Sequence, residues 1–281
     1  MATSEVALAQ ELRAREARET VRRSPRLDVF LLIGIAIAFG AALIGLRSTG
    51  VDITYFLQPT GAVMVLGGTF GVMLITTPRH ALIHSLRRVA TLASASDTDR
   101  AALIDEIVEY ARHARRGGLL GLEPMLPRVR NPLLGHALEL AVDISNHGEL
   151  RSVLETELHM AERQGEADAK TLEVAGGFAP TLGIVGTVVG LIEVLRGFSN
   201  LSSVGYGIGT AFVSTIYGLA LANLFLLPLA HRIRARVTEN FETQELILEG
   251  VLSIADSVHP SVIRMRLVSF LRKSETQHDA A

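Results

Sequence analysis

Four apolar stretches interrupt an otherwise polar chain, and their lengths indicate the fold class. They cover about residues 28–46, 60–77, 174–195 and 206–230. A helix needs roughly 20 residues to cross a hydrocarbon core about 30 Å thick, and each stretch is close to that length. Short loops join the first two stretches and the last two. The pattern predicts an all-α membrane protein with four transmembrane helices in two hairpins and a helical cytoplasmic domain.

The polar segments between and after the hairpins also have helical periodicity. Residues 101–116 place apolar side chains on one helix face, namely Leu103, Ile104, Ile107, Val108 and Ala111. The ranges 133–144, 150–160, 237–258 and 261–272 predict further helices. Gly117, Gly118 and a cluster of three prolines are expected to separate the first of these helices from the next. No stretch alternates as a strand does.

Arginine placement predicts the orientation, because cytoplasmic flanks carry the excess of basic residues. Arginines are frequent before the first stretch and after the second and fourth, whereas each short loop has one. Both termini are therefore expected in the cytoplasm. The predicted organisation is an Arg-rich N-terminal extension (1–27), transmembrane helices 1–2 (28–77), a cytoplasmic helical domain (78–173), transmembrane helices 3–4 (174–230) and cytoplasmic C-terminal helices (231–281).

Composition narrows the function classes. The chain has no cysteine and a formal net charge of −2, which leaves no disulfide or thiolate metal site and argues against general nucleic-acid binding. It has neither a phosphate-binding glycine loop with Lys-Ser/Thr nor a nucleophile elbow. His80 and His84 stand four apart without an evident third ligand. We expect no enzyme activity, no cofactor and no metal site, and contact between the N-terminal arginines and membrane lipid.

Small and hydroxylated residues share one face on each of the last two apolar stretches. On the third stretch they are Pro180, Gly183, Thr187 and Gly190, and on the fourth Ala211, Thr215, Gly218 and Ala222. Such faces could line a narrow ion pathway, because hydroxyl oxygens can replace part of an ion's hydration shell. Two alternatives are ordinary close helix packing and hydroxyls bonded to their own backbone.

Neither stretch carries a carboxylate near its middle, since Glu193 lies near the outer end of the third. Ion pathways across a bilayer usually contain an ionisable group. The sequence therefore predicts an obligate partner chain that supplies an acidic residue from its own membrane helix. Pro180 and Pro228 are expected to kink their helices near the cytoplasmic ends, which would suit a helix pair that moves.

Several motifs in order carry a family resemblance over about residues 27–271. They are the Ala-Pro-x-x-Gly-x-x-Gly-Thr-x-x-Gly run over 179–190, Thr215 with Pro228, the run 65–69, the charged segment 114–123, and the C-terminal runs 249–256 and 260–263. This arrangement resembles MotA/PomA flagellar-motor stator subunits within the MotA/TolQ/ExbB ion-channel family. Departures from the family pattern include Glu193, Ser261 and the N-terminal extension.

The resemblance implies an ion-conducting stator subunit in the bacterial inner membrane. It implies a homopentamer around a MotB/PomB-type single-span partner with a membrane Asp, and torque on a rotor switch protein of the FliG type. The resemblance implies that Thr187 and Thr215 line the ion pathway, to which the shared helix faces add Gly183 and Ala211. It also implies Pro180 and Pro228 for conformational coupling, and Arg115, Arg116 and Glu123 for rotor contact.

Threonine at both Thr187 and Thr215 resembles sodium-type members, so sodium is favoured over protons as the transported ion. Two other functions stay open. One is a TolQ/ExbB-like energiser of an outer-membrane or gliding system, and the other is a non-conducting membrane scaffold.

Overall fold

The computed structural model describes residues 26–27, 29–48, 50, 53–92, 94–95 and 99–278, and nearly all of them are helical. The predicted N-terminal extension, apart from its last two residues, lies outside the described residues. The first elements are β1 (Arg26–Leu27), α2 (Val29–Ser48), the 3₁₀ helix η1 (Ile53–Phe56), α3 (Pro59–Ala62), the π-helix η2 (Val63–Gly67), α4 (Gly68–Thr76), α5 (Arg79–Leu92) and β2 (Ser94–Ala95). The two strands are two residues each, too short for side-chain alternation.

The remaining elements are longer. They are α6 (Arg100–Gly117), the 3₁₀ segment η3 (Leu119–Arg128), α7 (Pro132–Asp143), α8 (His147–Arg196), α9 (Leu201–Ala220), the π-helix η4 (Leu221–Leu226), α10 (Leu227–Ala255) and α11 (Pro260–His278). Within the described residues, three helices are long and apolar enough to cross a membrane: Pro59–Thr76, His147–Arg196 and Leu201–Ala255. The all-α fold class is therefore confirmed.

The chain forms two compact units. One contains Ser94–His159 with residues 240–278 and is called the polar unit here. The other, the apolar unit, contains the described part of residues 27–93 with Met160–Glu239. Helices α8 and α10 contribute to both, because each continues from one unit into the other.

The core of the polar unit is built by the amphipathic helices that the sequence predicts. Leu103, Ile104, Ile107, Val108 and Ala111 of α6 are all buried, together with residues of α7, α8, α10 and α11. Asp99 caps α6 by accepting hydrogen bonds from the backbone N–H groups of Ala101 and Ala102. Asn131 caps α7 in the same way, and Pro132 takes the first helical position, where a missing N–H costs nothing.

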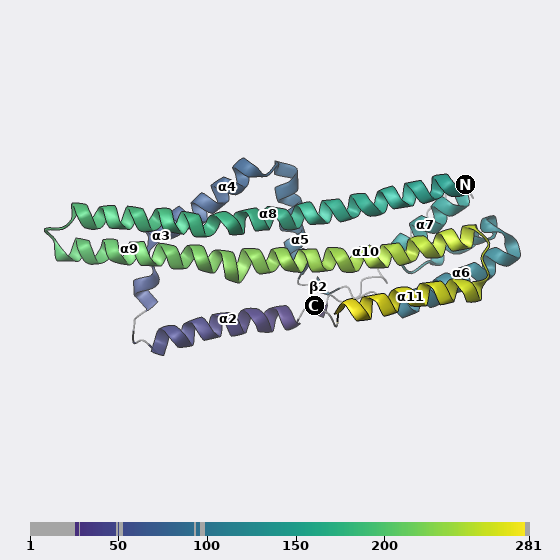
Figure 1. The fold of residues 1–281 in the computed structure, drawn as a ribbon, viewed down its shortest axis with the longest axis horizontal. Coiled ribbons are helices and arrows are strands. Elements are labelled where there is room, and N and C mark those ends of the chain that lie inside the picture. The colour runs from purple at the N-terminus through teal and green to yellow at the C-terminus, as the bar shows by residue number, and fades with distance from the viewer. Residues whose placement is uncertain are drawn as a thin grey trace, which may run out of the picture. The chain divides into compact units, whose positions relative to one another are not determined.

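In the apolar unit, α8 and α9 lie side by side as an antiparallel hairpin (Figure 1). Asn200 caps α9 at the turn, where its side chain accepts from the N–H of Ser202 at 3.0 Å. Helix α3 and the π-helix η2 pack against α9. The second and fourth apolar stretches each contain a π-helical segment, whereas α8 is α-helical throughout.

The predicted helix over 150–160 is not separate from the third apolar stretch. Both belong to α8, which has 50 residues. The residues between them, 161–173, are mostly good helix formers, and Gly165 is the one glycine in this segment. The fourth stretch likewise continues through η4 into α10. The predicted domain boundaries near 173 and 230 thus mark changes in hydropathy and not breaks in the helices.

Candidate functional site: paired threonines between α8 and α9

The hydroxyl groups of Thr187 on α8 and Thr215 on α9 meet between the two helices. Their Oγ1 atoms are 2.5 Å apart. Thr187 Oγ1 also lies 3.0 Å from the carbonyl oxygen of Ala211 and 3.1 Å from that of Gly183. A hydroxyl has one hydrogen to donate and two lone pairs. The two hydroxyls and two carbonyls therefore form a compact group of four oxygens, and only the two hydroxyl hydrogens are available for hydrogen bonds among them.

Small residues allow this approach. A Cβ atom at Gly183 would lie 2.9 Å from the carbonyl oxygen of Ser214, and one at Gly190 would lie 2.6 Å from the nitrogen of Ala211. Ala211 itself is buried. Within one chain, Gly183 and Ala211 therefore lie in the α8–α9 contact, as the packing alternative proposes. Both threonines are only half-buried, and the ion-pathway role of these four residues stays a prediction.

The two prolines lie in different backbone environments. Pro180 is half-buried in an α-helix that continues on both sides of it. Its Cα lies 3.2 Å from where a Cβ at Gly218 of α9 would be. Pro228 is the second residue of α10, directly after the π-helix η4. A proline lacks the N–H that an α-helical ladder requires, and a π-helical turn is one way to accommodate that loss.

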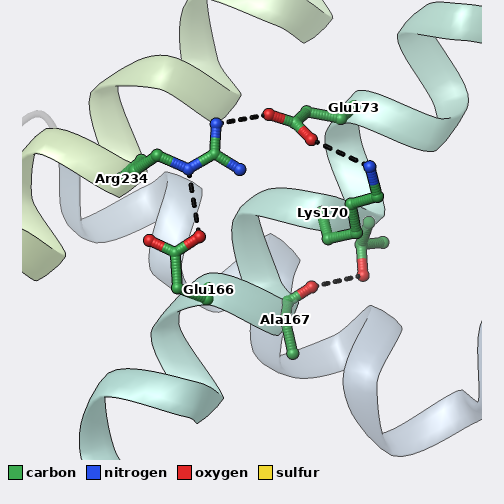
Figure 2. A network of polar contacts seen from close by, with 6 residues as sticks. Glu166, Ala167, Lys170, Glu173 and Arg234 are labelled. Atoms are coloured by element: carbon green, nitrogen blue, oxygen red, sulfur yellow. Dashed lines mark hydrogen bonds and ion pairs between the residues drawn. The ribbon is translucent and has the colours of Figure 1, made fainter.

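An ion-pair network not predicted from sequence joins α8 to α10 in the apolar unit (Figure 2). Arg234 of α10 donates from Nε to Glu166 at 3.0 Å and from Nη1 to Glu173 at 2.6 Å. Lys170 donates to the other oxygen of Glu173 at 3.3 Å. The hydrogen bond from Arg234 lowers the pKa of Glu173 below its usual value, so this carboxylate stays ionised at neutral pH. In the sequence, the signal that could have indicated this network is the i, i+4, i+7 spacing of Glu166, Lys170 and Glu173 on one face of α8.

A second pair joins α5 to α8. The Asp168 side chain is 1% exposed and lies 3.0 Å from Nε of Arg88. Gln164 donates to the same carboxylate at 3.2 Å, and Ser85 Oγ donates to the backbone oxygen of Asp168 at 2.9 Å. Each oxygen of this buried carboxylate thus has a partner within its own chain. Asp168 lies outside the apolar stretch that begins at Val174.

A third unpredicted group of hydrogen bonds links the residues just before α3 to α9. Thr210 donates to the side-chain oxygen of Gln58 at 3.3 Å, and the hydroxyl of Tyr217 donates to the carbonyl of Phe56. Ser214 donates to the carbonyl of Thr210 at 2.6 Å and so satisfies its hydroxyl inside its own helix. These bonds fix the start of α3 against the fourth apolar stretch.

The candidate rotor-contact residues lie on the surface of the polar unit. Arg115 and Arg116 are exposed in the last turn of α6, and Glu123 is exposed in η3. Gly118, with φ of 73°, provides the left-handed backbone that ends α6 between them. Helix α6 packs against η3. The structure therefore presents the three charges on two consecutive elements that contact each other.

The fold and this site together define a multi-pass membrane protein with a hydroxyl-lined helix pair. Residues 126–245 match the model of the MotA/TolQ/ExbB proton channel family. Motility protein A of Bacillus subtilis (strain 168) is 31% identical over 250 residues, which cover 87% of this chain and 91% of that protein. Chemotaxis protein PomA of Vibrio alginolyticus is 26% identical over 249 residues, covering 89% and 97%.

Solved structures agree in fold. The flagellar MotAB stator complex from Bacillus subtilis contains a chain that is 30% identical, with a TM-score of 0.79, covering 89% of this chain and 98% of that one. MotAB of C. jejuni has a chain with a TM-score of 0.81 at 24% identity, covering 87% and 96%, and supports the fold alone. The chain belongs to the Motility protein A branch of the MotA/TolQ/ExbB proton channel family.

Proposed function

We propose that the chain is an ion-conducting stator subunit of the bacterial flagellar motor, which couples ion influx to torque. The observation that carries the proposal is the Thr187–Thr215 hydroxyl pair between two closely packed apolar helices, in a chain that is 31% identical to a Motility protein A. The TolQ/ExbB-like alternative is not favoured, because the similar curated proteins include several named for motility.

Deletion of this chain is the direct test. Cells without it should assemble flagella that do not rotate, and expression of the chain from a plasmid should restore swimming. Swimming speed and flagellar number should be measured in the same cells. Normal swimming in the deletion strain would contradict the proposal. A defect confined to the outer membrane would favour the TolQ/ExbB-like alternative.

The missing carboxylate supports a partner subunit. The apolar stretches of this chain place no carboxylate near their middles, and solved relatives are described as MotAB complexes. We propose a MotB/PomB-type single-span partner whose membrane Asp faces Thr187 and Thr215. Several copies of this chain, in a pentamer, would surround that partner.

The proposed topology has four spans. Helix α2 has 20 residues and one basic residue, in its last turn, which suffices to cross a hydrocarbon core. It would form the first hairpin with the helix over 59–76. The proposed location is the bacterial inner membrane. The arginine distribution supports an orientation with both termini in the cytoplasm and the short loops outside, and it would place the basic flanks near lipid headgroups.

Rotor contact by Arg115, Arg116 and Glu123 has its own test. Arg115→Glu and Glu123→Lys should each reduce swimming speed severalfold, because charges at such a contact set its register and association. Both side chains are exposed, so membrane levels of the subunit and partner binding should not change. Arg151→Glu, at another exposed site of the polar unit, is the matched control. Unchanged swimming in both test variants would show that the rotor contacts another surface.

Sodium is the proposed ion, because two threonine oxygens and two carbonyl oxygens form a group that suits a dehydrated cation better than a proton relay. Swimming should stop when external sodium is removed while the proton gradient is kept. Thr187→Ser should retain this dependence, since it retains the hydroxyl. If swimming speed does not depend on sodium, the transported ion is the proton.

A further inference from the structure

The bridge from Arg234 to α8 spans two helical turns. Glu166, Lys170 and Glu173 lie at i, i+4 and i+7 and therefore share one face of α8. A single guanidinium contacts both carboxylates of that face, at 3.0 and 2.6 Å (Figure 2). Because the two contacts are seven residues apart, the bridge resists both sliding of α10 along α8 and rotation of either helix about its axis.

The two helices are also closely packed beside the bridge. A Cβ atom at Gly176 would lie 2.8 Å from Leu227, and one at Gly165 would collide with Val237. Between these two positions, buried residues of α8 pack against buried residues of α10, namely Ala169 and Leu172 against Ala230 and Ile233. The bridge and these contacts together form what we call the inner seam.

A second close contact, the outer seam, joins α8 to α9 around the threonine pair. A Cβ atom at Gly218 would lie 2.6 Å from the carbonyl oxygen of Ala179, and one at Gly190 would lie 2.7 Å from that of Gly207. These distances leave no room for side chains, so the two backbones are in contact.

Along the chain from α9 to α10, a π-helical segment separates the two seams, and a proline lies at the edge of each seam. The π-helix η4 lies between Gly218 of the outer seam and Leu227 of the inner seam, and Pro228 directly follows Leu227. On α8, Pro180 directly follows Ala179 at the edge of the outer seam and removes one N–H from the helix. π-Helical turns and prolines are the usual places where helices bend. A bend is therefore easiest between the seams.

From this arrangement we infer that Arg234 is a positioning residue for the coupling of ion flow to movement. Its bridge to Glu166 and Glu173 makes the inner ends of the two helices move as one body when the helices bend between the seams. Without the bridge, ions still pass the threonine pair, but α10 slides along α8 when the helices bend. The bend then no longer moves the two helices together. This inference rests on the proposed stator function.

An arginine is suited to this role for a physical reason. Its planar guanidinium presents several N–H groups in fixed directions and can hold two carboxylates at once, which a lysine ammonium does not do with the same geometry. The Arg234 side chain is 40% exposed and Glu173 is 19% exposed. The bridge therefore contributes modestly to folding, and its loss should leave the subunit assembled.

The test compares torque with ion uptake in cells that express the full chain with its partner. Arg234→Gln should lower stall torque, measured on tethered beads, by about threefold or more, while ion uptake per assembled complex stays within about twofold of the unmodified protein. Lys170→Gln is the matched control, because it removes a contact of Glu173 without removing the link to α10. The double variant Arg234→Glu with Glu173→Arg should recover part of the torque that Arg234→Glu loses.

Each outcome of this experiment either supports or contradicts the inference about Arg234. Loss of torque with retained uptake and recovery in the double variant supports the inference. Unchanged torque in Arg234→Gln overturns it. A parallel fall in torque, uptake and membrane level shows a purely structural role, and absence of recovery shows that Glu173 is not the partner that matters. If the unmodified protein itself neither conducts nor rotates, the proposed function fails instead.

Discussion

Replacing Gly218 with alanine is expected to destabilise the subunit by about 1–3 kcal/mol, because the added methyl group overpacks a backbone contact. Its Cβ would lie 2.6 Å from the carbonyl oxygen of Ala179 and 3.1 Å from Cα of Gly183. Both neighbours are backbone atoms, which cannot move aside as the end of a side chain can. Thermal unfolding of the solubilised subunit should therefore shift to lower temperature, and the membrane level should fall.

Gly177→Ala on α8 is the matched control. A Cβ atom there meets nothing within 4 Å. Alanine is favoured over glycine inside a helix by about 0.5–1 kcal/mol, so this variant should be as stable as the unmodified subunit or slightly more stable. The opposite signs expected of the two glycine substitutions separate backbone contact from helix propensity. Equal unfolding temperatures for the two variants would contradict the close α8–α9 contact.

The helices that cross or flank the membrane could be predicted because hydropathy and periodicity are local. The amphipathic face of residues 101–116 corresponds to α6, and its five predicted core residues are buried. The third apolar stretch lies within α8. What hydropathy does not report is helix continuity, since a polar helical segment and a helix end both appear as a fall in hydropathy. The sequence over 161–173 had the composition of a helix, and propensity was the signal that would have joined the two segments.

The candidate site was predictable in part for a related reason. Spacing alone places Thr187 with Gly183 and Thr215 with Ala211, because each pair lies on one helix. The contact between the two threonines depends on how far α8 is shifted along α9. A periodic pattern in the sequence does not encode this shift. The contacts of Arg234 could not be predicted for the same reason, because this residue is 68 positions from Glu166 and 61 from Glu173 in the chain. The π-helices have no distinctive sequence pattern here beyond the nearby Pro228.

Replacing Thr215 with alanine should stop most ion flow while leaving the fold nearly intact. The hydroxyl of Thr187 keeps the carbonyl oxygens of Gly183 and Ala211 as acceptors after the substitution, so one neutral hydrogen bond is lost, at a cost of about 1 kcal/mol. A hydrogen bond or contact to a charged group contributes about 1.5–3 kcal/mol. Since 1.4 kcal/mol corresponds to a factor of ten in rate, ion uptake should fall by about 10- to 100-fold.

Thr215→Ser and Thr156→Ala separate the hydroxyl from the fold. Serine retains the oxygen at position 215 and should retain most of the uptake. Thr156 also lies on α8 and donates to its own helix, at 2.6 Å from the carbonyl of Ser152, but it belongs to the polar unit. Its replacement should change neither uptake nor swimming. Because the scaffold hypothesis assigns no ion to the pair, it requires that cells carrying Thr215→Ala show unchanged ion uptake and unchanged swimming. Uptake and swimming speed in these three variants therefore distinguish an ion-coordinating threonine pair from one that only packs two helices together.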